Sequence, residues 1–252
     1  MKNIYINTII MTGTECSSQK DFIKEAALLD LPIQGVEVRR EYFPFDQKEK
    51  EEEISLILET GKRKNWQVRY SVPEPLFTPT GLNVSFGQWL EEAKRLGAES
   101  IKCNIGEVEG ISKKAKAELD HYLMKYPIEV TIENDQTQKN GLLKHVLKAI
   151  SLLKEHHLPI GYTFDLGNWL EVGEDPEESF RQTKSEIRAL HLKNLNFEGQ
   201  VVLLEQGCIP WKEYLAKEWP IVLEYPMNFE ELEKEVIQVK EGKCVGKSNN
   251  DR

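Results

Sequence analysis

The stretch GYTFDLGNWL, residues 161–170, carries an apolar run that ends in a carboxylate. β-Branched and aromatic residues dominate positions 160–164, which is typical of a strand buried on both faces. Asp165 ends this run, and Gly167 follows two residues later. A carboxylate at the end of a strand either caps the next helix or is held there for chemistry. The rest of the chain decides between these two interpretations.

The same rhythm of strand and helix repeats along all 252 residues. Apolar residues spaced three and four apart predict helices between the strands. The predicted strands are 4–10, 35–39, 67–72, 100–104, 128–133, 160–164, 187–192 and 221–224. The predicted helices are 19–29, 48–64, 87–96, 113–124, 142–156, 176–184, 211–217 and 229–239.

A strand followed each time by a helix predicts parallel βαβ units with right-handed crossovers. Eight such units in about 250 residues favour a closed barrel over an open sheet, so we expect an α/β protein, a single-domain (β/α)8 TIM barrel. The barrel is predicted to span residues 1–241. Residues 242–252, GKCVGKSNNDR, are expected to form a flexible tail.

Composition excludes several classes of function. The net charge of -9, from 33 basic and 42 acidic residues, argues against a general nucleic-acid surface. No apolar run reaches the roughly 20 residues of a membrane helix. The cysteines lie far apart without a CxxC pair, which indicates free thiols. We therefore expect a cytoplasmic protein with no nucleic-acid or membrane partner.

Polar side chains stand at the ends of six predicted strands. In a TIM barrel the carboxyl ends of the strands face the active-site loops, and side chains two apart lie on one face of a strand. Inward-facing residues would therefore gather in one pocket. They are Glu37, Arg39, Lys102, Asn104, Glu133, Asp165, His191, Lys193 and Glu224.

Four of these residues predict a metal site: Glu133, Asp165, His191 and Glu224, on four successive strands. Unpaired charges at the end of a barrel would repel one another and would be costly to desolvate, whereas a divalent cation would hold them together. Three oxygen donors and an imidazole form a hard site, which favours Mn²⁺ or Mg²⁺, with Zn²⁺ or Co²⁺ as alternatives. Asp165 is accordingly expected to be a ligand rather than a helix cap.

The second half of the chain resembles a known family, the sugar phosphate isomerases and epimerases among the xylose-isomerase-like TIM barrels. The matching segments are IEN (132–134), FDLGN (164–168), HLKN (191–194), EQGCIPWKEYL (205–215) and LEY (223–225). The resemblance implies that Glu133 and Glu224 face each other across the substrate as proton-transfer residues and also bind the metal. It implies that Asp165 and His191 act as ligands only.

The chain departs from the family at three places. Asn168 stands where many members have a substrate-binding histidine, and Lys139 and Phe197 replace a glutamate and an arginine of the ketose 3-epimerases. The metal pattern is retained while part of the sugar-binding pattern is lost, so we do not expect a free hexose as substrate. The endonuclease branch of the superfamily uses many histidines; here only His191 lies at a strand end, so abasic-site DNA repair is not expected.

Together these features predict a metal-dependent isomerase or epimerase that acts on a keto-sugar acid or a sugar phosphate by proton transfer through an enediolate. The predicted substrate-binding residues are Glu37, Arg39, Lys102, Asn104, Asn168 and Lys193. The three cations among them would suit a carboxylate or phosphate group, or they balance the acidic residues. A dehydratase or lyase acting on a hydroxy acid and an inactive metabolite-binding barrel stay open as alternatives. The oligomeric state is also open, with a homodimer as one option.

Overall fold

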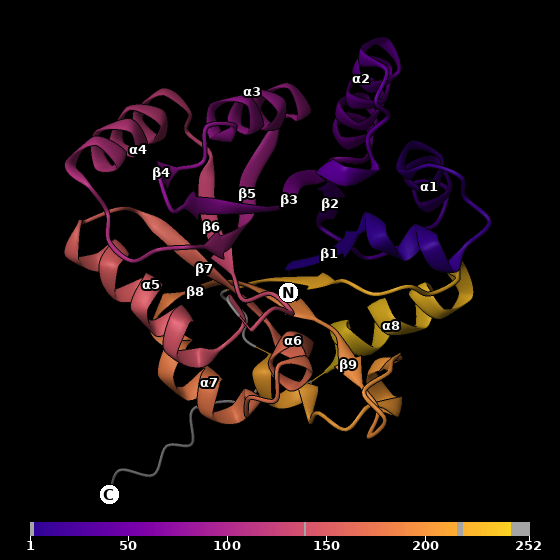
Figure 1. Ribbon diagram of the computed structural model, residues 1–252. Helices are drawn as coiled ribbons and strands as arrows, with labels where there is room; N and C mark the ends of the chain where they lie inside the picture. The colour runs from indigo at the N-terminus through magenta and orange to yellow at the C-terminus, as the bar shows by residue number, and fades with distance from the viewer. Residues whose placement is uncertain (1–2, 139, 216–218, 243–252) are drawn as a thin grey trace, which may run out of the picture.

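The computed structural model describes residues 3–138, 140–215 and 219–242. Eight parallel strands form the barrel, and pairing of the second with the third strand closes it (Figure 1). These strands are β1 (Asn3–Asn7), β2 (Gly35–Arg39), β3 (Gln67–Thr78), β5 (Ala98–Gly106), β6 (Glu129–Glu133), β7 (Ile160–Asp165), β8 (Ile187–Leu192) and β11 (Pro220–Leu223). The predicted (β/α)8 TIM barrel is confirmed.

Helices surround the barrel, as Figure 1 shows. They are α1 (Gln19–Ala26), α2 (Gln47–Lys64), α3 (Phe86–Leu96), α4 (Lys113–Lys125), α5 (Leu143–Glu155), α6 (Leu166–Glu171), α7 (Pro176–Thr183) and α8 (Phe229–Glu241). Short strands add to this frame: β4 (Gly81–Leu82) lies antiparallel to the end of β3, and β9 (Asn194–Leu195) pairs with β10 (Val201–Val202). Within the described ranges, no helix has the length and apolarity needed to cross a membrane.

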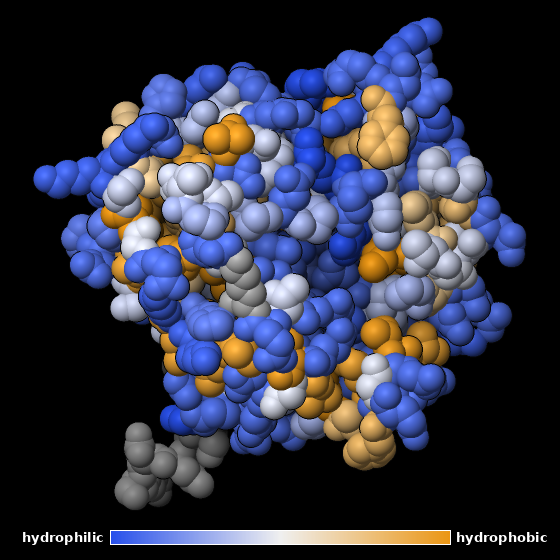
Figure 2. Space-filling model, viewed as in Figure 1, coloured by the Kyte–Doolittle hydropathy of each residue, from blue (hydrophilic) through white to orange (hydrophobic). Residues whose placement is uncertain are grey.

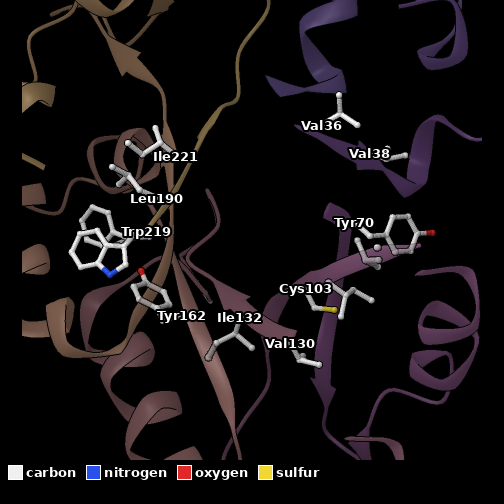
Figure 3. Packing of buried hydrophobic residues seen from close by; sticks show 14 of the residues in the cluster. Val36, Val38, Tyr70, Cys103, Val130, Ile132, Tyr162, Leu190, Trp219 and Ile221 are labelled. Atoms are coloured by element: carbon white, nitrogen blue, oxygen red, sulfur yellow. The ribbon is translucent and has the colours of Figure 1, made fainter. Parts of the chain in front are cut away.

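Alternation along the strands separates the hydrophobic core from the pocket. In β2, Val36 and Val38 belong to the main hydrophobic cluster, whereas Glu37 between them contacts His191 inside the barrel. Ile132 and Glu133 of β6 divide in the same way, because successive side chains point to opposite faces of a strand. Figure 3 shows the apolar members of this alternation on several strands. A slip of one residue in any of these strands would turn the polar side chain of that strand toward the helices.

Several predicted elements differ from the structure. The strand predicted at 67–72 continues to Thr78, the helix predicted at 19–29 ends at Ala26, and α6 was not predicted. The predicted strand 4–10 ends at Asn7, whose side chain accepts a hydrogen bond from the Ile9 amide (2.8 Å) and starts a 3-10 helix, Thr8–Gly13. The predicted helix 211–217 is a 3-10 helix, Trp211–Tyr214, followed by extended backbone at Leu215. The end of that predicted helix and residues 243–252 of the predicted tail lie outside the described residues.

The connection between β8 and β11 contains no α-helix in its described part, because its loop is organised around a buried side chain. The Asn194 amide donates to the carbonyl oxygens of Leu204 and Ile209 and accepts from the Ile209 amide. Gly207 packs directly on this side chain: a Cβ at that position would lie 2.1 Å from the Asn194 side chain. Three backbone groups of the loop are thereby satisfied without helical hydrogen bonds.

Candidate active site

The four predicted metal ligands meet at the carboxyl end of the barrel. One ligand atom from each of Glu133, Asp165, His191 and Glu224 lies within 4.8 Å of the others, and all four residues are buried. Strand register contributes to this arrangement, since Asp165 of β7 pairs with His191 of β8. A pocket of about 300 Å³ opens above the cluster, and all its members except His191 line this pocket. Figure 2 shows hydrophilic residues around a hollow near the middle of one face of the molecule.

The imidazole of His191 stands at the centre of the cluster and is fully buried. Its Nδ1 lies 2.5 Å from Oε2 of Glu224 and 2.8 Å from Oε1 of Glu133. Of these two contacts, the one with Glu224 has the geometry of a hydrogen bond, and Oε1 of Glu133 is buried without a hydrogen-bond partner among the residues that the structure describes. An unsatisfied buried acceptor is costly. A cation held between these donor atoms would remove that cost, so the residues fit a divalent metal ion.

A basic side chain holds the second oxygen of each glutamate. Nζ of Lys102 lies 2.5 Å from Oε2 of Glu133, and Nη1 of Arg39 lies 2.5 Å from Oε1 of Glu224. The other oxygen of each carboxylate therefore faces the centre of the cluster. Partners of this kind orient metal ligands and restrict their motion.

Electrostatics in the cluster favours an imidazolium when no cation is present. Burial lowers the pKa of His191, but the surrounding carboxylates, first among them Glu37, raise it well above its ordinary value. Burial opposes ionisation of Glu224, yet the charges of His191, Lys102 and Arg39 together hold its pKa well below the usual range. Burial raises the pKa of Asp165 to about 7, against the opposing charge of Lys193. Because a metal binds the neutral imidazole, metal binding would displace a proton from His191.

Asp165 caps a helix, so the expectation that it is not a cap is wrong. Its side chain accepts a hydrogen bond from the Asn168 amide (2.9 Å) at the start of α6, and it also contributes a ligand atom to the cluster. Asn134 fixes its backbone: Oδ1 of Asn134 accepts from the Asp165 amide and Nδ2 donates to the Asp165 carbonyl, both at 3.0 Å. The two roles are compatible because a carboxylate has two oxygens.

The predicted substrate-binding residues divide into two groups. The pocket is lined by five of them, Arg39, Lys102, Asn104, Asn168 and Lys193, but not by Glu37. Glu37 is 1% exposed and lies against Nε2 of His191 at 3.3 Å.

Each of the three predicted substrate-binding cations already has a carboxylate partner. Lys102 pairs with Glu133 and Arg39 with Glu224, and Nζ of Lys193 lies 2.8 Å from Oε1 of Glu171. These contacts favour charge balance over the binding of an anionic substrate group. Lys193 also donates to Oδ1 of Asn168.

Two further positions depart from the family pattern, Phe197 and Lys139. Phe197 is 94% exposed and belongs to the short connection between β9 and β10. Lys139 lies outside the described residues.

Three residues that hold the site together were not predicted from the sequence. Asn7 donates to Oε1 of Glu37 (2.8 Å) and of Glu224 (3.3 Å), and Asn134 and Glu171 fix the positions of Asp165 and Lys193. Asn7 interrupts the apolar run of the predicted strand 4–10, and this polar position is its signal in the sequence. Asn134 stands in the IEN segment directly after the predicted ligand, which is a readable signal. Nothing in the sequence around Glu171 distinguishes it from a solvated helix residue.

Comparisons with known proteins identify structures with the same fold at low sequence identity. No protein-family profile and no curated protein matches the chain. Among solved structures, a D-tagatose 3-epimerase-like protein is similar with a TM-score of 0.68 and 16% identity, over 96% of each chain. The chain has the fold of the xylose-isomerase-like TIM barrels.

Other solved structures with this fold carry different activities. A probable 3-DHS dehydratase from Bacillus anthracis is similar with a TM-score of 0.65 and 17% identity, over 96% of this chain and 100% of that one. A family 2 AP endonuclease from Brucella melitensis is similar with a TM-score of 0.66 and 16% identity, over 96% of this chain and 100% of that one. The fold therefore leaves the reaction open, and the side chains of the site have to decide it.

Proposed function

We propose that this protein is a divalent-metal-dependent isomerase or epimerase of a small sugar or sugar derivative. The observation that carries the proposal is the buried four-donor cluster beneath one pocket, in which Glu133 and Glu224 each direct one oxygen to Nδ1 of His191. Three carboxylates and an imidazole without thiolate suit Mn²⁺ or Mg²⁺. The similarity to a D-tagatose 3-epimerase-like structure supports the same class of reaction.

A cation at this site would act as a Lewis acid and stabilise negative charge on the carbonyl oxygen of a substrate. Glu133 and Glu224 would remove and return the proton on the carbon next to that carbonyl. Glu133 is paired with Lys102 and Glu224 with Arg39, so each carboxylate is held in place by a basic side chain. Asp165 and His191 would bind the ion without taking part in the proton transfer.

The pocket limits the substrate. A volume of about 300 Å³ accepts a small molecule. A carboxylate or phosphate of the substrate would have to compete with Glu224 for Arg39, or with Glu171 for Lys193. The proposed substrate therefore carries a carbonyl group beside a hydroxyl group, and it does not need a negative charge.

A dehydratase is the second candidate, and one contact favours it. Lys102 lines the pocket beside Glu133, so a hydrogen-bond donor stands next to the proton acceptor, which suits the departure of a hydroxyl group after proton removal. The similarity to a probable dehydratase points the same way.

One experiment separates these functions. The Mn²⁺-loaded protein is incubated in D₂O with ketoses, keto-sugar acids, sugar phosphates and hydroxy acids, and the products are followed by NMR. An isomeric product with deuterium next to the carbonyl supports the proposal, and an unsaturated product that has lost water supports the dehydratase. Binding of a sugar without any product would contradict catalysis and indicate a metabolite-binding barrel.

Asp165→Asn separates the capping role of this residue from its proposed ligand role. Asparagine caps helices about as well as aspartate, so the unfolding midpoint should change little. Loss of the carboxylate charge should lower the affinity for Mn²⁺ by more than the roughly 10- to 100-fold that outer partners of metal ligands contribute. Calorimetric titration with Mn²⁺ measures the effect. If the Mn²⁺ affinity were unchanged, Asp165 would not be a metal ligand and its role would be to cap the helix.

A further inference from the structure

Glu37 is a buried carboxylate of the site that has no contact with the pocket. It is 1% exposed, and the pocket walls do not include it. A carboxylate is costly to desolvate, so its place inside the barrel needs a compensating role. Its nearest titratable partner is the imidazole of His191, at 3.3 Å.

The two nitrogens of His191 point to different neighbours. Nδ1 lies 2.5 and 2.8 Å from the oxygens of Glu224 and Glu133, whereas Nε2 points to Oε1 of Glu37. Nε2 is buried and has no hydrogen bond of good geometry within the described residues, so the Glu37 carboxylate is the acceptor in reach. When a histidine binds a metal through one nitrogen, the partner of the other nitrogen determines where the proton resides.

Neighbouring strands hold Glu37 from both sides. Asn7 is its register partner on β1 and donates to its Oε1 at 2.8 Å. Arg69 is its register partner on β3, and Nε of Arg69 lies 3.9 Å from its Oε2. The carboxylate is therefore fixed in place before any ligand binds.

We propose that Glu37 is a positioning residue that accepts the Nε2–H of His191 and so leaves Nδ1 free to bind the cation. This inference rests on the proposed function, because it requires a metal ion at the cluster. It replaces the substrate-binding role expected for Glu37 from the sequence.

Mn²⁺ affinity of Glu37→Gln tests the inference. The amide has the same shape but is a weaker acceptor, and the affinity should fall roughly 10- to 100-fold, the usual effect of losing such a partner. Glu53→Gln is the matched control: Glu53 is 0% exposed, lies on α2 and accepts from the Lys20 amide (3.1 Å). Its Mn²⁺ affinity should equal that of the wild type.

The outcomes distinguish the inference from the function on which it rests. A wild type that binds Mn²⁺ and a folded Glu37→Gln variant that binds it equally well overturn the positioning role alone. A wild type that binds no metal overturns both.

A second readout needs no variant. In the wild type loaded with diamagnetic Zn²⁺, ¹⁵N NMR of the His191 ring should show a proton on Nε2 and none on Nδ1. The opposite tautomer contradicts the positioning role even if Glu37→Gln fails to fold.

Discussion

Replacing Glu224 by glutamine is expected to lower turnover by a factor of about 10² to 10⁴, the contribution of a positioned general base. Oε2 of Glu224 lies 2.5 Å from Nδ1 of His191, and its other oxygen lies 2.5 Å from Arg39, so the carboxylate is held in one orientation. Glutamine keeps this shape and one acceptor oxygen but cannot take a proton. The fold should therefore be retained, with part of the metal affinity, while the chemical step is lost.

Glu133→Gln should show the same loss, and Glu41→Gln supplies the control. Glu41 accepts from Nε of Arg39 at 2.6 Å but has no atom in the metal cluster, so its replacement should leave turnover near the wild-type value. Steady-state rates at saturating Mn²⁺ separate loss of chemistry from loss of the ion. Near wild-type turnover in both the Glu133 and the Glu224 variants would contradict the mechanism and reassign the proton transfer to Lys102 or Lys193.

Lys102→Met is expected to lower the free energy of unfolding by about 3–5 kcal/mol, the cost of breaking a buried ion pair by removing one partner. Lys102 is 4% exposed, and its Nζ lies 2.5 Å from Oε2 of Glu133. Burial lowers the pKa of Lys102, but the charges of Glu133, Glu224 and Glu37 together outweigh this effect and the pKa is raised, so the lysine is ionised. Without it, both oxygens of Glu133 would be buried and unpaired.

Urea denaturation measures this change, and metal should reverse part of it. Because a bound cation would neutralise Glu133, Mn²⁺ should stabilise Lys102→Met more than it stabilises the wild type. Lys116→Met is the control: Lys116 pairs with Asp120 on the surface of α4 at 2.7 Å, and removing such a pair costs only about 0.3–0.5 kcal/mol. A loss below about 1 kcal/mol for Lys102→Met would contradict the tight, desolvated pair seen here.

Strand alternation explains why so much of the site could be predicted from the sequence. In stretches such as Val36–Val38 and Ile132–Glu133 the apolar residue faces the helices and the polar one faces the barrel interior, and parallel strands bring their carboxyl ends together. The first fact follows from the two-residue period of a strand and the second from the parallel direction of the strands. These rules predict which face of the strand a side chain occupies, but not how far inside the barrel it lies. The sequence therefore predicts Glu37 on the pocket wall, whereas the structure places it against His191 and away from the pocket.

The remaining errors have local causes. The apolar residues Ile9 and Ile10 continue the pattern of β1, and this concealed the polar end of the strand at Asn7. The partners of the three basic residues Arg39, Lys102 and Lys193 depend on which carboxylate lies nearest in space. The spacing of residues along the sequence does not reveal this. The apolar residues around Trp211 suggested a helix, but Asn194 organises the preceding loop through contacts distant in sequence.

The stoichiometry of bound metal tests the central claim most directly. Protein stripped with a chelator, reloaded with Mn²⁺ and freed of excess ion is analysed for its elements, beside an Asp165→Ala, Glu224→Ala double variant. The proposed site predicts one Mn²⁺ per chain in the wild type and none in the double variant. A wild type without stoichiometric metal, or a double variant that holds as much as the wild type, would contradict a metal centre at Glu133, Asp165, His191 and Glu224.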